Sequence, residues 1–368
     1  MKKICFILPT LQAGGLENYV LRFLKYAEGQ YEVTILCASN EDPHLLNEYV
    51  KLGVNIVFKR FGYYNPIVFI QLFKYLFINK FEVICSFSGN FSGLSLLISN
   101  IAKIPIRIAF YRRSSNGFKI NSIRLLYNYI CNRLVYYNAT NILSNSKFAF
   151  KVFFPLEYKN DSKFKVIKNG VGKSAFTPNK DISLLRYKYG IPLNAFVVGH
   201  IGRYDSSKNH ITIIRVAQIL LRQYSDIVFV FCGKDTDSDE FKKVVGEEDC
   251  SNRIICLGLQ TNVPEVLQLM DLFYFPSVTE GQPNALIEAM LTGLPVITSN
   301  IEPIKETIPE YAHLHLLDPF NINNAVDLIA LLKIDINLRE KYIYKHWAAH
   351  EYDLNTNFRL FRDVIDGK

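Results

Sequence analysis

Short runs of apolar residues recur along the whole chain, and longer stretches with a helical spacing of apolar positions separate them. The runs are rich in Val, Ile and Phe and are bounded by Gly, Pro, Asn or Asp. Almost uninterrupted apolar strands of this kind are typical of parallel sheets covered by helices on both faces. We therefore expect strands at 2–7, 32–37, 55–58, 82–87, 106–111, 141–146, 165–167, 195–202, 226–233, 253–258, 272–277 and 294–299.

The expected strands form two successive series, which predicts an α/β chain with two doubly wound Rossmann-like domains. Segment 169–181 is rich in Gly, Pro and Asn, has little periodicity, and marks the boundary. We expect a first domain over 1–173, a second over 174–350 and a final helix over 351–368. One buried face of that helix is expected to consist of Leu354, Phe358, Phe361 and Ile365.

The start of the chain, MKKICFILPTLQ, has two lysines before an apolar run, as signal peptides do. The run is too short and leads into a glycine turn, so we interpret it as the first strand. The longest uncharged stretch, 83–102, contains nine Ser, Gly and Asn residues and is not expected to span a membrane. Seven scattered cysteines without a CxxC pair are typical of reduced thiols in a cytoplasm.

Charge divides the chain into a basic and an acidic half. Residues 1–190 hold 26 Lys and Arg against 10 Asp and Glu, a net +16, whereas residues 191–368 have a net −8. The basic half is expected to face anionic lipid or an acidic acceptor, or else it carries solvated lysines without a partner. Nucleic acid is not expected, because no reading motif is present. The apolar helix at 66–80 is expected to be mostly core, with its lysines and the 112–113 region facing the membrane or acceptor.

Two turns that follow strands are candidate phosphate sites. Gly14 and Gly15 precede a helix, so they permit close backbone approach, although a tight turn without function fits equally well. Arg203 and Lys208 follow the strand at 195–202, where parallel sheets bind ligands. The guanidinium and the ammonium suit a diphosphate, and ordinary surface cations are the alternative.

The segment PSVTEGQPNALIEAMLTGLPVI (276–297) carries two glutamates in a defined frame. Glu280 lies in the loop after a strand, and Pro283 is suited to open a helix that contains Glu288. Gly293 ends that helix before the next strand. The two carboxylates are therefore expected one helix length apart, where one reaches a sugar and the other a ribose.

The order of GGLEN (14–18), NGV (169–171), GR…K (202–208), MDLFYFPS (270–277) and EGQPNALIEAM…GLPVI (280–297) resembles the family 4 glycosyltransferases of the GT-B superfamily. The resemblance covers nearly the whole chain. It implies two Rossmann-like domains that face each other across a cleft, with the last helix crossing back onto the first domain.

The resemblance also implies roles for individual residues. Arg203 and Lys208 match the cations that bind the leaving diphosphate, Glu280 matches the glutamate at the donor sugar, and Glu288 matches the one at the ribose hydroxyls. The remaining donor-binding residues implied are Gly14, Gly15, Gly258, Leu259, Gly281, Asn284, Ala285 and Leu286.

The implied reaction is retaining transfer of a hexose or N-acetylhexosamine from a nucleotide diphosphate, UDP rather than GDP. The implied acceptor is lipid-linked or a polysaccharide in cell-envelope glycan synthesis, at the inner face of the cytoplasmic membrane. No metal and no other cofactor is expected. Relatives often carry a histidine in the first domain, whereas this chain offers Ser88, Arg112 and Arg113 on the acceptor side.

Two other readings stay open: a nucleotide-sugar epimerase on the same fold, and a non-catalytic protein that binds sugar nucleotides. Two further clusters mimic metal sites. Asp235, Asp237 and Asp239 form Asp-x-Asp pairs, but acidic residues also favour a helix start. His346 and His350 are one helical turn apart, and no third ligand accompanies them.

Overall fold

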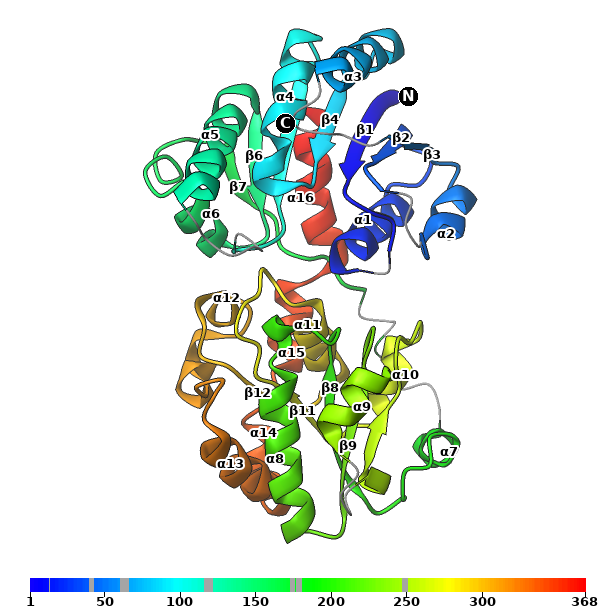
Figure 1. The fold of residues 1–368 in the computed structure, drawn as a ribbon, viewed down its shortest axis with the longest axis vertical. Coiled ribbons are helices and arrows are strands. Elements are labelled where there is room, and N and C mark those ends of the chain that lie inside the picture. Colours follow the sequence, from blue (N-terminus) through cyan, green and yellow to red (C-terminus); the bar gives the residue numbers. More distant parts are fainter. Residues whose placement is uncertain are drawn as a thin grey trace. The chain divides into compact units, whose positions relative to one another are not determined.

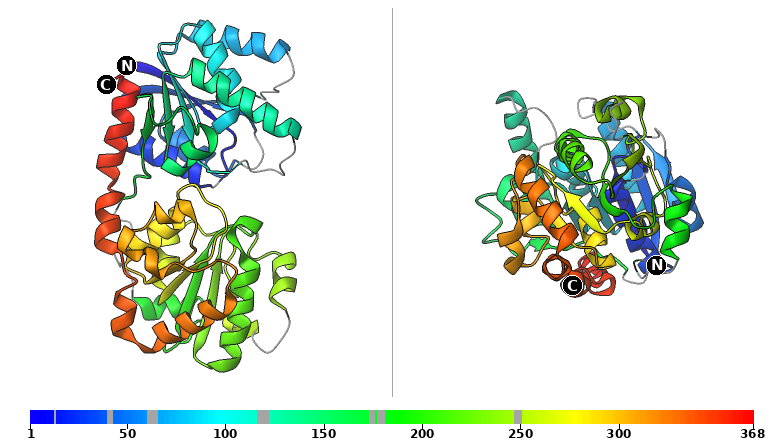
Figure 2. Two further views of the ribbon diagram at one scale, coloured as in Figure 1. Left: turned by 90° about the vertical axis from the view of Figure 1, so that its left-hand side faces the viewer. Right: turned by 90° about the horizontal axis from the view of Figure 1, so that it is seen from below.

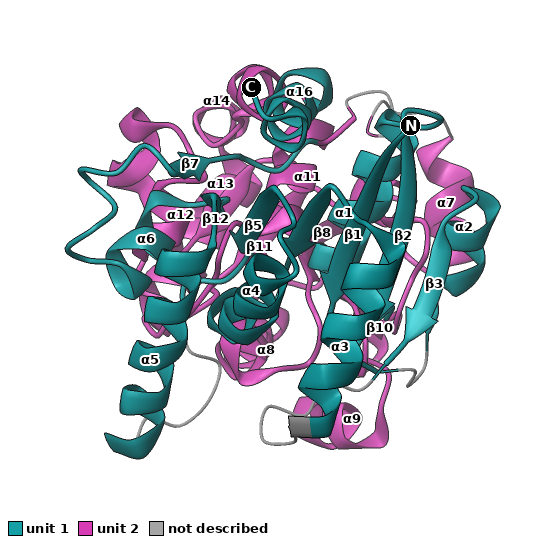
Figure 3. Cartoon of the chain, turned by 90° about the horizontal axis from the view of Figure 1, so that it is seen from above, with its two compact units in different colours: residues 1–170, 354–368 teal, residues 171–353 magenta. Residues whose placement is uncertain are grey.

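The structure is a computed structural model that describes residues 1–12, 14–39, 43–59, 66–115, 122–172, 176, 181–246 and 251–368. The chain divides into two compact units (Figure 3). Unit 1 comprises Met1–Gly170 and Leu354–Lys368, and unit 2 comprises Val171–Asp353. The expected divisions were 173/174 and 350/351, and part of the expected linker lies outside the described residues. Both units are parallel sheets with helices on both faces, which confirms the expected fold class.

Unit 1 contains a seven-stranded parallel sheet in the order β3-β2-β1-β4-β5-β6-β7. Every expected strand of the first half is present, within three residues of its expected ends. The strands are β1 (Lys2–Leu8), β2 (Tyr31–Cys37), β3 (Asn55–Phe58), β4 (Val83–Ser86), β5 (Ile106–Tyr111), β6 (Asn141–Ser144) and β7 (Phe164–Val166).

Helices cover both faces of this sheet (Figure 1). They are α1 (Gly15–Tyr26), α2 (Leu46–Lys51), α3 (Pro66–Asn79), α4 (Ser92–Ile101), α5 (Ser122–Asn138), α6 (Lys147–Phe153) and α16 (Leu354–Asp366). The left view of Figure 2 shows α3 and α5 on one side of the sheet and α16 on the other. Alternate side chains of β1 point to opposite faces of the sheet. Phe6 packs with α1 and α16, while Cys5 and Ile7 pack with α3 and α4.

The last helix, α16, lies in unit 1 although it is the C-terminal segment. Phe358, Phe361 and Ile365 are fully buried, as the sequence pattern predicts. The Phe361 ring centroid lies 4.6 Å from that of Phe23, and the Phe358 centroid lies 5.3 Å from that of Tyr19. Aromatic pairs at such distances add to the free energy gained by burial.

Unit 2 contains a five-stranded parallel sheet in the order β10-β9-β8-β11-β12, which again matches the expected strands. Its strands are β8 (Phe196–Ile201), β9 (Ile227–Cys232), β10 (Ile254–Cys256), β11 (Leu272–Phe275) and β12 (Val296–Thr298). Its helices are α7 (Ile182–Lys188), α8 (His210–Gln223), α9 (Asp239–Val245), α10 (Val263–Gln268), α11 (Asn284–Thr292), α12 (Glu302–Lys305), α13 (Ile322–Ile334), α14 (Ile336–Glu340) and α15 (Lys345–Glu351).

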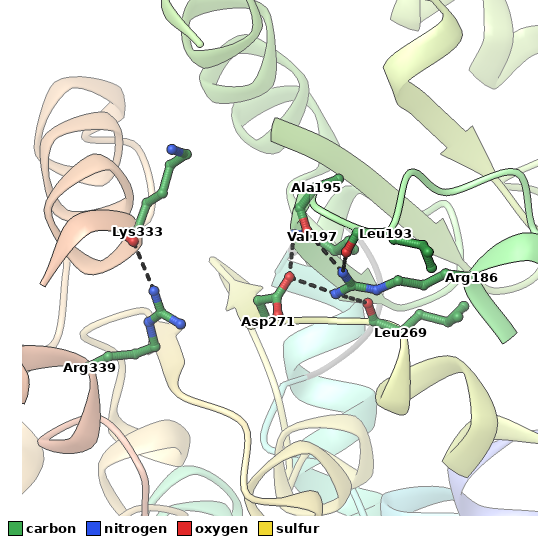
Figure 4. A network of polar contacts seen from close by, with 8 residues as sticks. All are labelled: Arg186, Leu193, Ala195, Val197, Leu269, Asp271, Lys333 and Arg339. Carbon is green, nitrogen blue, oxygen red and sulfur yellow. Dashed lines mark hydrogen bonds and ion pairs between the residues drawn. The ribbon is translucent and has the colours of Figure 1, made fainter. Parts of the chain in front are cut away.

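A buried arginine attaches α7 to the sheet of unit 2 (Figure 4). The Arg186 guanidinium donates to the carbonyls of Leu193, Ala195 and Leu269 over 2.8–3.2 Å and to the Asp271 carboxylate over 2.8 Å. That carboxylate also accepts from the amide of Val197 over 2.7 Å. Arg186 thus connects the segments that enter β8 and β11, at the amino ends of these strands.

Helix α3 differs from its expected environment. Leu72 and Leu76 are buried, but Ile67, Ile70, Phe77 and Ile78 are 56–71% exposed, so the expectation of a mostly core helix is wrong for one face. None of the helices in the described part of the chain combines the length and apolar character needed to span a bilayer.

Candidate active site

The carboxyl ends of β8 and β11 lie side by side where the strand order of unit 2 reverses. From β8 the order proceeds through β9 to β10, and it resumes on the other side of β8 with β11. Open parallel sheets bind ligands in the crevice at such a point. Residues 202–208 follow β8 and residues 276–280 follow β11, so two expected site segments leave the sheet together.

Lys208 and Glu280 contact each other at this edge, although they are 72 positions apart. Nζ of Lys208 donates to Oε1 of Glu280 over 2.5 Å, and the two side chains are 21% and 9% exposed. The ammonium also lies 5.2 Å from the ring centroid of Phe275. Because the pair is shielded from water, its attraction exceeds that of a surface pair and holds both side chains in place.

Local backbone bonds position Lys208. Asp205 accepts from the amide of Ser207 over 2.8 Å and caps the short 3₁₀ turn that contains Lys208. Asn209 is left-handed, with φ 57°, and its Nδ2 donates to the carbonyl of Pro276 over 3.2 Å. The amide of Val278 donates to the carbonyl of Ser207 over 2.9 Å. These bonds join the loops after β8 and β11 directly.

Arg203 is exposed, and no hydrogen bond or ion pair engages it among the described residues. Partial burial acts to raise the pKa of Asp205, but hydrogen bonds from Ser207 and the charges of Arg203 and Lys208 lower it overall. The two cations therefore face two carboxylates, Asp205 and Glu280.

Three glycines let the ends of β8, β9 and β10 approach closely. A Cβ on Gly233, at φ +143°, would lie 2.3 Å from the carbonyl oxygen of Gly202. The amide of Gly233 donates to the carbonyl of Gly258 over 2.8 Å. A Cβ on Gly258 would lie 2.4 Å from Oδ2 of Asp237. Leu259, the next residue, is 41% exposed, so both of these expected donor-binding residues lie on this edge.

The N-terminus of α11 follows Glu280 after a short loop through the half-buried Gly281. Pro283 is the N-cap and supplies no side-chain cap, so the first amides of the helix meet no cap there. Such an end attracts anions. Asn284 and Ala285 are half-buried, whereas the Leu286 side chain is fully buried and only its backbone is suited to contact a ligand.

The second glutamate, Glu288, is half-buried in the second turn of α11. Gly293 ends the helix in the left-handed conformation at φ 93°, as the sequence predicts. Glu280 and Glu288 thus lie before and within one helix, in the arrangement that their spacing predicted.

Two buried histidines beneath Lys208 were missed by the sequence analysis. The rings of His200 and His210 lie 4.8 Å apart, and Nδ1 of His200 is 2.9 Å from the carbonyl oxygen of Tyr274. Burial lowers the pKa of His210 to about 4, and burial also holds the pKa of His200 well below its ordinary value. Both rings are therefore neutral at neutral pH. A histidine inside an apolar strand, as in VVGHIG, is the signal that points to such a site.

In unit 1 the expected residues also gather at a carboxyl edge. The strand order reverses between β1 and β4, and Gly14 and Ser88 follow those strands. Gly14 has a local reason to be glycine, since a Cβ there would lie 2.4 Å from Oε2 of Glu17. Arg112 follows β5 and is half-buried, with its Nε and Nη1 atoms shielded from solvent. Arg113, the next residue, is exposed.

The clusters that mimic metal sites take ordinary positions. Asp239 is in the first turn of α9, where the helix dipole favours an acidic residue, and Asp237 faces Gly258. His350 is 92% exposed on α15. In the described ranges, no three His, Cys, Asp or Glu side chains gather in a group that could hold a metal ion.

The chain thus consists of two Rossmann-like units, with cations and carboxylates at the switch point of the second, and it shares this fold with solved glycosyltransferases. A family model described as Glycosyl transferases group 1 matches residues 181–346. This match lies within unit 2, and together with the relatives below it supports the resemblance to the family 4 glycosyltransferases.

Known relatives extend this assignment. CapH of Staphylococcus aureus, a capsular polysaccharide biosynthesis glycosyltransferase, is 28% identical over 313 residues, 83% of each chain. The Escherichia coli UDP-Gal:α-D-GlcNAc-diphosphoundecaprenol α-1,3-galactosyltransferase is 27% identical over 241 residues, 63% of this chain and 61% of that protein. Anabaena HepE, solved in complex with UDP-glucose, matches the fold with a TM-score of 0.81 at 18% identity over 100% of both chains.

Proposed function

We propose that this protein transfers a hexose or N-acetylhexosamine from a UDP-sugar to a lipid-linked or polysaccharide acceptor, with retention at the anomeric carbon. The observation that carries the proposal is the pairing of Lys208 with Glu280 beside Arg203, at the switch point of unit 2. The printed name of the E. coli relative supports a UDP-sugar donor and a diphosphoundecaprenol acceptor. CapH supports a role in envelope polysaccharide synthesis.

The leaving diphosphate is the main target of catalysis. Cleavage of the bond between sugar and diphosphate places negative charge on the phosphate and positive charge on the anomeric carbon. Arg203 and Lys208 stabilise the developing negative charge, and the amides at the N-terminus of α11 add their dipoles. Cations fixed before the reaction act most strongly, which is what the contact between Lys208 and Glu280 provides.

Glu280 has a second role once the donor is bound. When the diphosphate binds, its oxygens replace Glu280 as the partner of the Lys208 ammonium. The Glu280 carboxylate then accepts hydrogen bonds from the hydroxyl groups of the transferred sugar. Glu288 binds the ribose hydroxyls, and the edge at Gly258 and Leu259 lies against the base. A carboxylate at the sugar also stabilises positive charge at the anomeric carbon.

Retention requires no protein nucleophile in this scheme. The departing phosphate oxygen accepts the proton of the attacking acceptor hydroxyl on the same face of the sugar that it has left. Arg203 and Lys208 take the role that a metal ion has in other glycosyltransferases, so we expect no metal requirement.

The acceptor side belongs to unit 1, which we propose docks on the inner face of the cytoplasmic membrane. The exposed face of α3 at Ile67, Ile70, Phe77 and Ile78 supports this, together with the net +16 of residues 1–190. A lipid-linked acceptor would then be reached at the membrane surface.

Hydrolysis of a panel of UDP- and GDP-sugars, with and without a chelator, tests the proposal. We expect slow hydrolysis of at least one UDP-sugar, with the anomeric configuration of the released sugar retained. Binding of UDP without hydrolysis or transfer would favour the non-catalytic alternative. Loss of activity with chelator that Mg²⁺ or Mn²⁺ restores would contradict metal independence and return attention to Asp235, Asp237 and Asp239.

A further inference from the structure

A half-buried arginine of unit 1 lies at the ligand-binding edge of its sheet. Arg112 directly follows β5, and β5 neighbours β4 at the reversal of strand order. The Arg112 guanidinium carbon lies 3.9 Å from the ring centroid of Tyr19 on α1 and 5.2 Å from that of Phe110. The side chain therefore extends from the end of β5 back to α1, beside the crevice outside β1 and β4.

Three polar atoms of this cluster have no hydrogen-bond partner among the described residues. Nε and Nη1 of Arg112 and the hydroxyl of Tyr19 are buried and have no hydrogen-bond partner in the part of the chain that the structure describes. Burial lowers the pKa of Arg112 to about 10, so its guanidinium still carries its charge at neutral pH. A buried cation without acceptors is costly, and native proteins rarely keep one.

Two other arginines of this chain have a structural role, and their guanidinium groups donate hydrogen bonds to acceptors of the protein. Arg107 donates from Nε to the carbonyl of Asn138 over 2.7 Å and from Nη1 to the carbonyl of Ile104 over 2.6 Å. Arg186 donates to three carbonyls and a carboxylate. Nε and Nη1 of Arg112 have no such acceptors among the described residues. The guanidinium lies over two aromatic rings, and the Glu17 carboxylate is near enough to act to raise its pKa.

We propose that Arg112 binds a phosphate group at the carboxyl edge of unit 1, together with the Tyr19 hydroxyl. A phosphate carries several acceptor oxygens in a tetrahedral arrangement, so one group can meet divergent donors that a planar carboxylate cannot. The N-terminus of α1 beside the crevice and the positive charge of nearby Arg22 also favour an anion, whereas Glu17 in the first turn of α1 opposes one.

The phosphate has two possible sources, the nucleotide donor and a phosphate-linked acceptor. Assignment to either one rests on the proposed glycosyl transfer, whereas the phosphate site itself does not. Two titrations of the full chain separate the sources: UDP alone, and inorganic pyrophosphate after saturation with UDP. The variant is Arg112→Gln, and the matched control is Arg359→Gln, an exposed arginine of the same unit.

We expect Arg112→Gln to lose about 10-fold or more in affinity in one of the two titrations, since a charge-assisted contact is removed. Loss with UDP assigns the phosphate to the nucleotide, and loss with pyrophosphate assigns it to a second, acceptor-side site. Arg359→Gln should match the wild type in both. Wild-type affinity of Arg112→Gln in both titrations, or no pyrophosphate binding together with unchanged UDP affinity, would overturn the proposal.

Thermal unfolding distinguishes a ligand site from a structural role. Arg112→Gln removes an unsatisfied buried charge and should melt no lower than the wild type. Arg107→Gln, which breaks hydrogen bonds that are made, should melt at a lower temperature. If Arg112→Gln fails to fold or melts as low as Arg107→Gln, Arg112 is a structural residue and the phosphate site is rejected.

Discussion

At the scale of single residues, the edge of unit 2 combines charged groups with neighbours that must stay neutral. The rings of His200 and His210 lie beneath the Lys208 loop, and Lys208 itself disfavours their protonation. If either ring became charged, it would add a cation to a site already built around two. The low pKa values that burial imposes on these rings therefore keep the charge at this edge independent of pH near neutrality.

These histidines predict acid sensitivity of the fold. The folded-state pKa of His210 is about 4, below its ordinary value of 6.5, so the unfolded chain binds more protons between these values. The free energy of unfolding should fall by about 1–3 kcal/mol as the pH drops from 7 to 4. His210→Phe should flatten part of this dependence in urea unfolding, whereas the exposed His350→Gln should not. An identical pH profile for His210→Phe would contradict the assignment.

Sequence reasoning at this scale found which residues share an edge but not which of them touch. Arg203, Lys208 and Glu280 follow strand ends, and that alone places them together. The contact between Lys208 and Glu280 depends on β8 and β11 being neighbours, which is a property of the strand order. The burial of Arg112 likewise depends on α1 packing beside the end of β5.

At the scale of elements, α16 shows how much of unit 1 depends on the end of the chain. Phe361 is fully buried, with ring contacts to Phe6, Phe23, Phe87 and Phe110. The spacing of apolar residues predicts this face, because a helix places positions three and four apart on the same side. The strands are predicted in a different way. Each of the twelve strands in the described part of the chain is an apolar run bounded by turn residues.

A matched pair of substitutions on α16 tests this dependence. Phe361→Ala should lower the free energy of unfolding by about 3–5 kcal/mol, through lost burial and a cavity. Leu360→Ala, at a neighbouring position that is 44% exposed, should change it by well under 1 kcal/mol. Urea unfolding followed by circular dichroism measures both. Equal effects of the two substitutions would show that α16 does not pack as described.

Helix α3 is the element for which the apolar pattern misled the prediction. Nearly all its positions are apolar, so periodicity gives no sign of which side faces the sheet. Packing decides: Leu72 and Leu76 face the sheet, and Ile70 and Phe77 face outward. An exposed apolar face on a helix of this kind favours a partner other than water.

At the scale of the whole molecule, charge and exposed apolar surface belong to the same half of the sequence. The net +16 of residues 1–190 accompanies the exposed face of α3 and exposed residues of α5 such as Ile123 and Leu126. Each basic residue near an anionic leaflet contributes about 1 kcal/mol, and inserted apolar side chains add to that.

Vesicle co-sedimentation tests the membrane proposal. Binding should be strong on anionic vesicles, weak on neutral ones and reduced by salt. Phe77→Ser with Ile78→Ser should weaken binding to anionic vesicles about tenfold or more. Leu314→Ser removes an exposed leucine from unit 2 and should have no effect. Equal binding to neutral and anionic vesicles, or binding to neither, would contradict the proposal that unit 1 docks on an anionic membrane.

Turnover of the variants Arg203→Ala and Lys208→Ala tests directly the proposal that these two cations stabilise the diphosphate as it leaves. Each loses one charge-assisted contact worth about 1.5–3 kcal/mol, so kcat should fall roughly 10- to 150-fold. Arg222→Ala, at an exposed arginine on α8, should retain wild-type turnover. It and Arg203→Ala should melt near the wild-type temperature, and Lys208→Ala should stay folded but melt lower because Glu280 loses its partner. Wild-type kcat in both Arg203→Ala and Lys208→Ala, measured on the UDP-sugar that the wild type hydrolyses, would contradict the account.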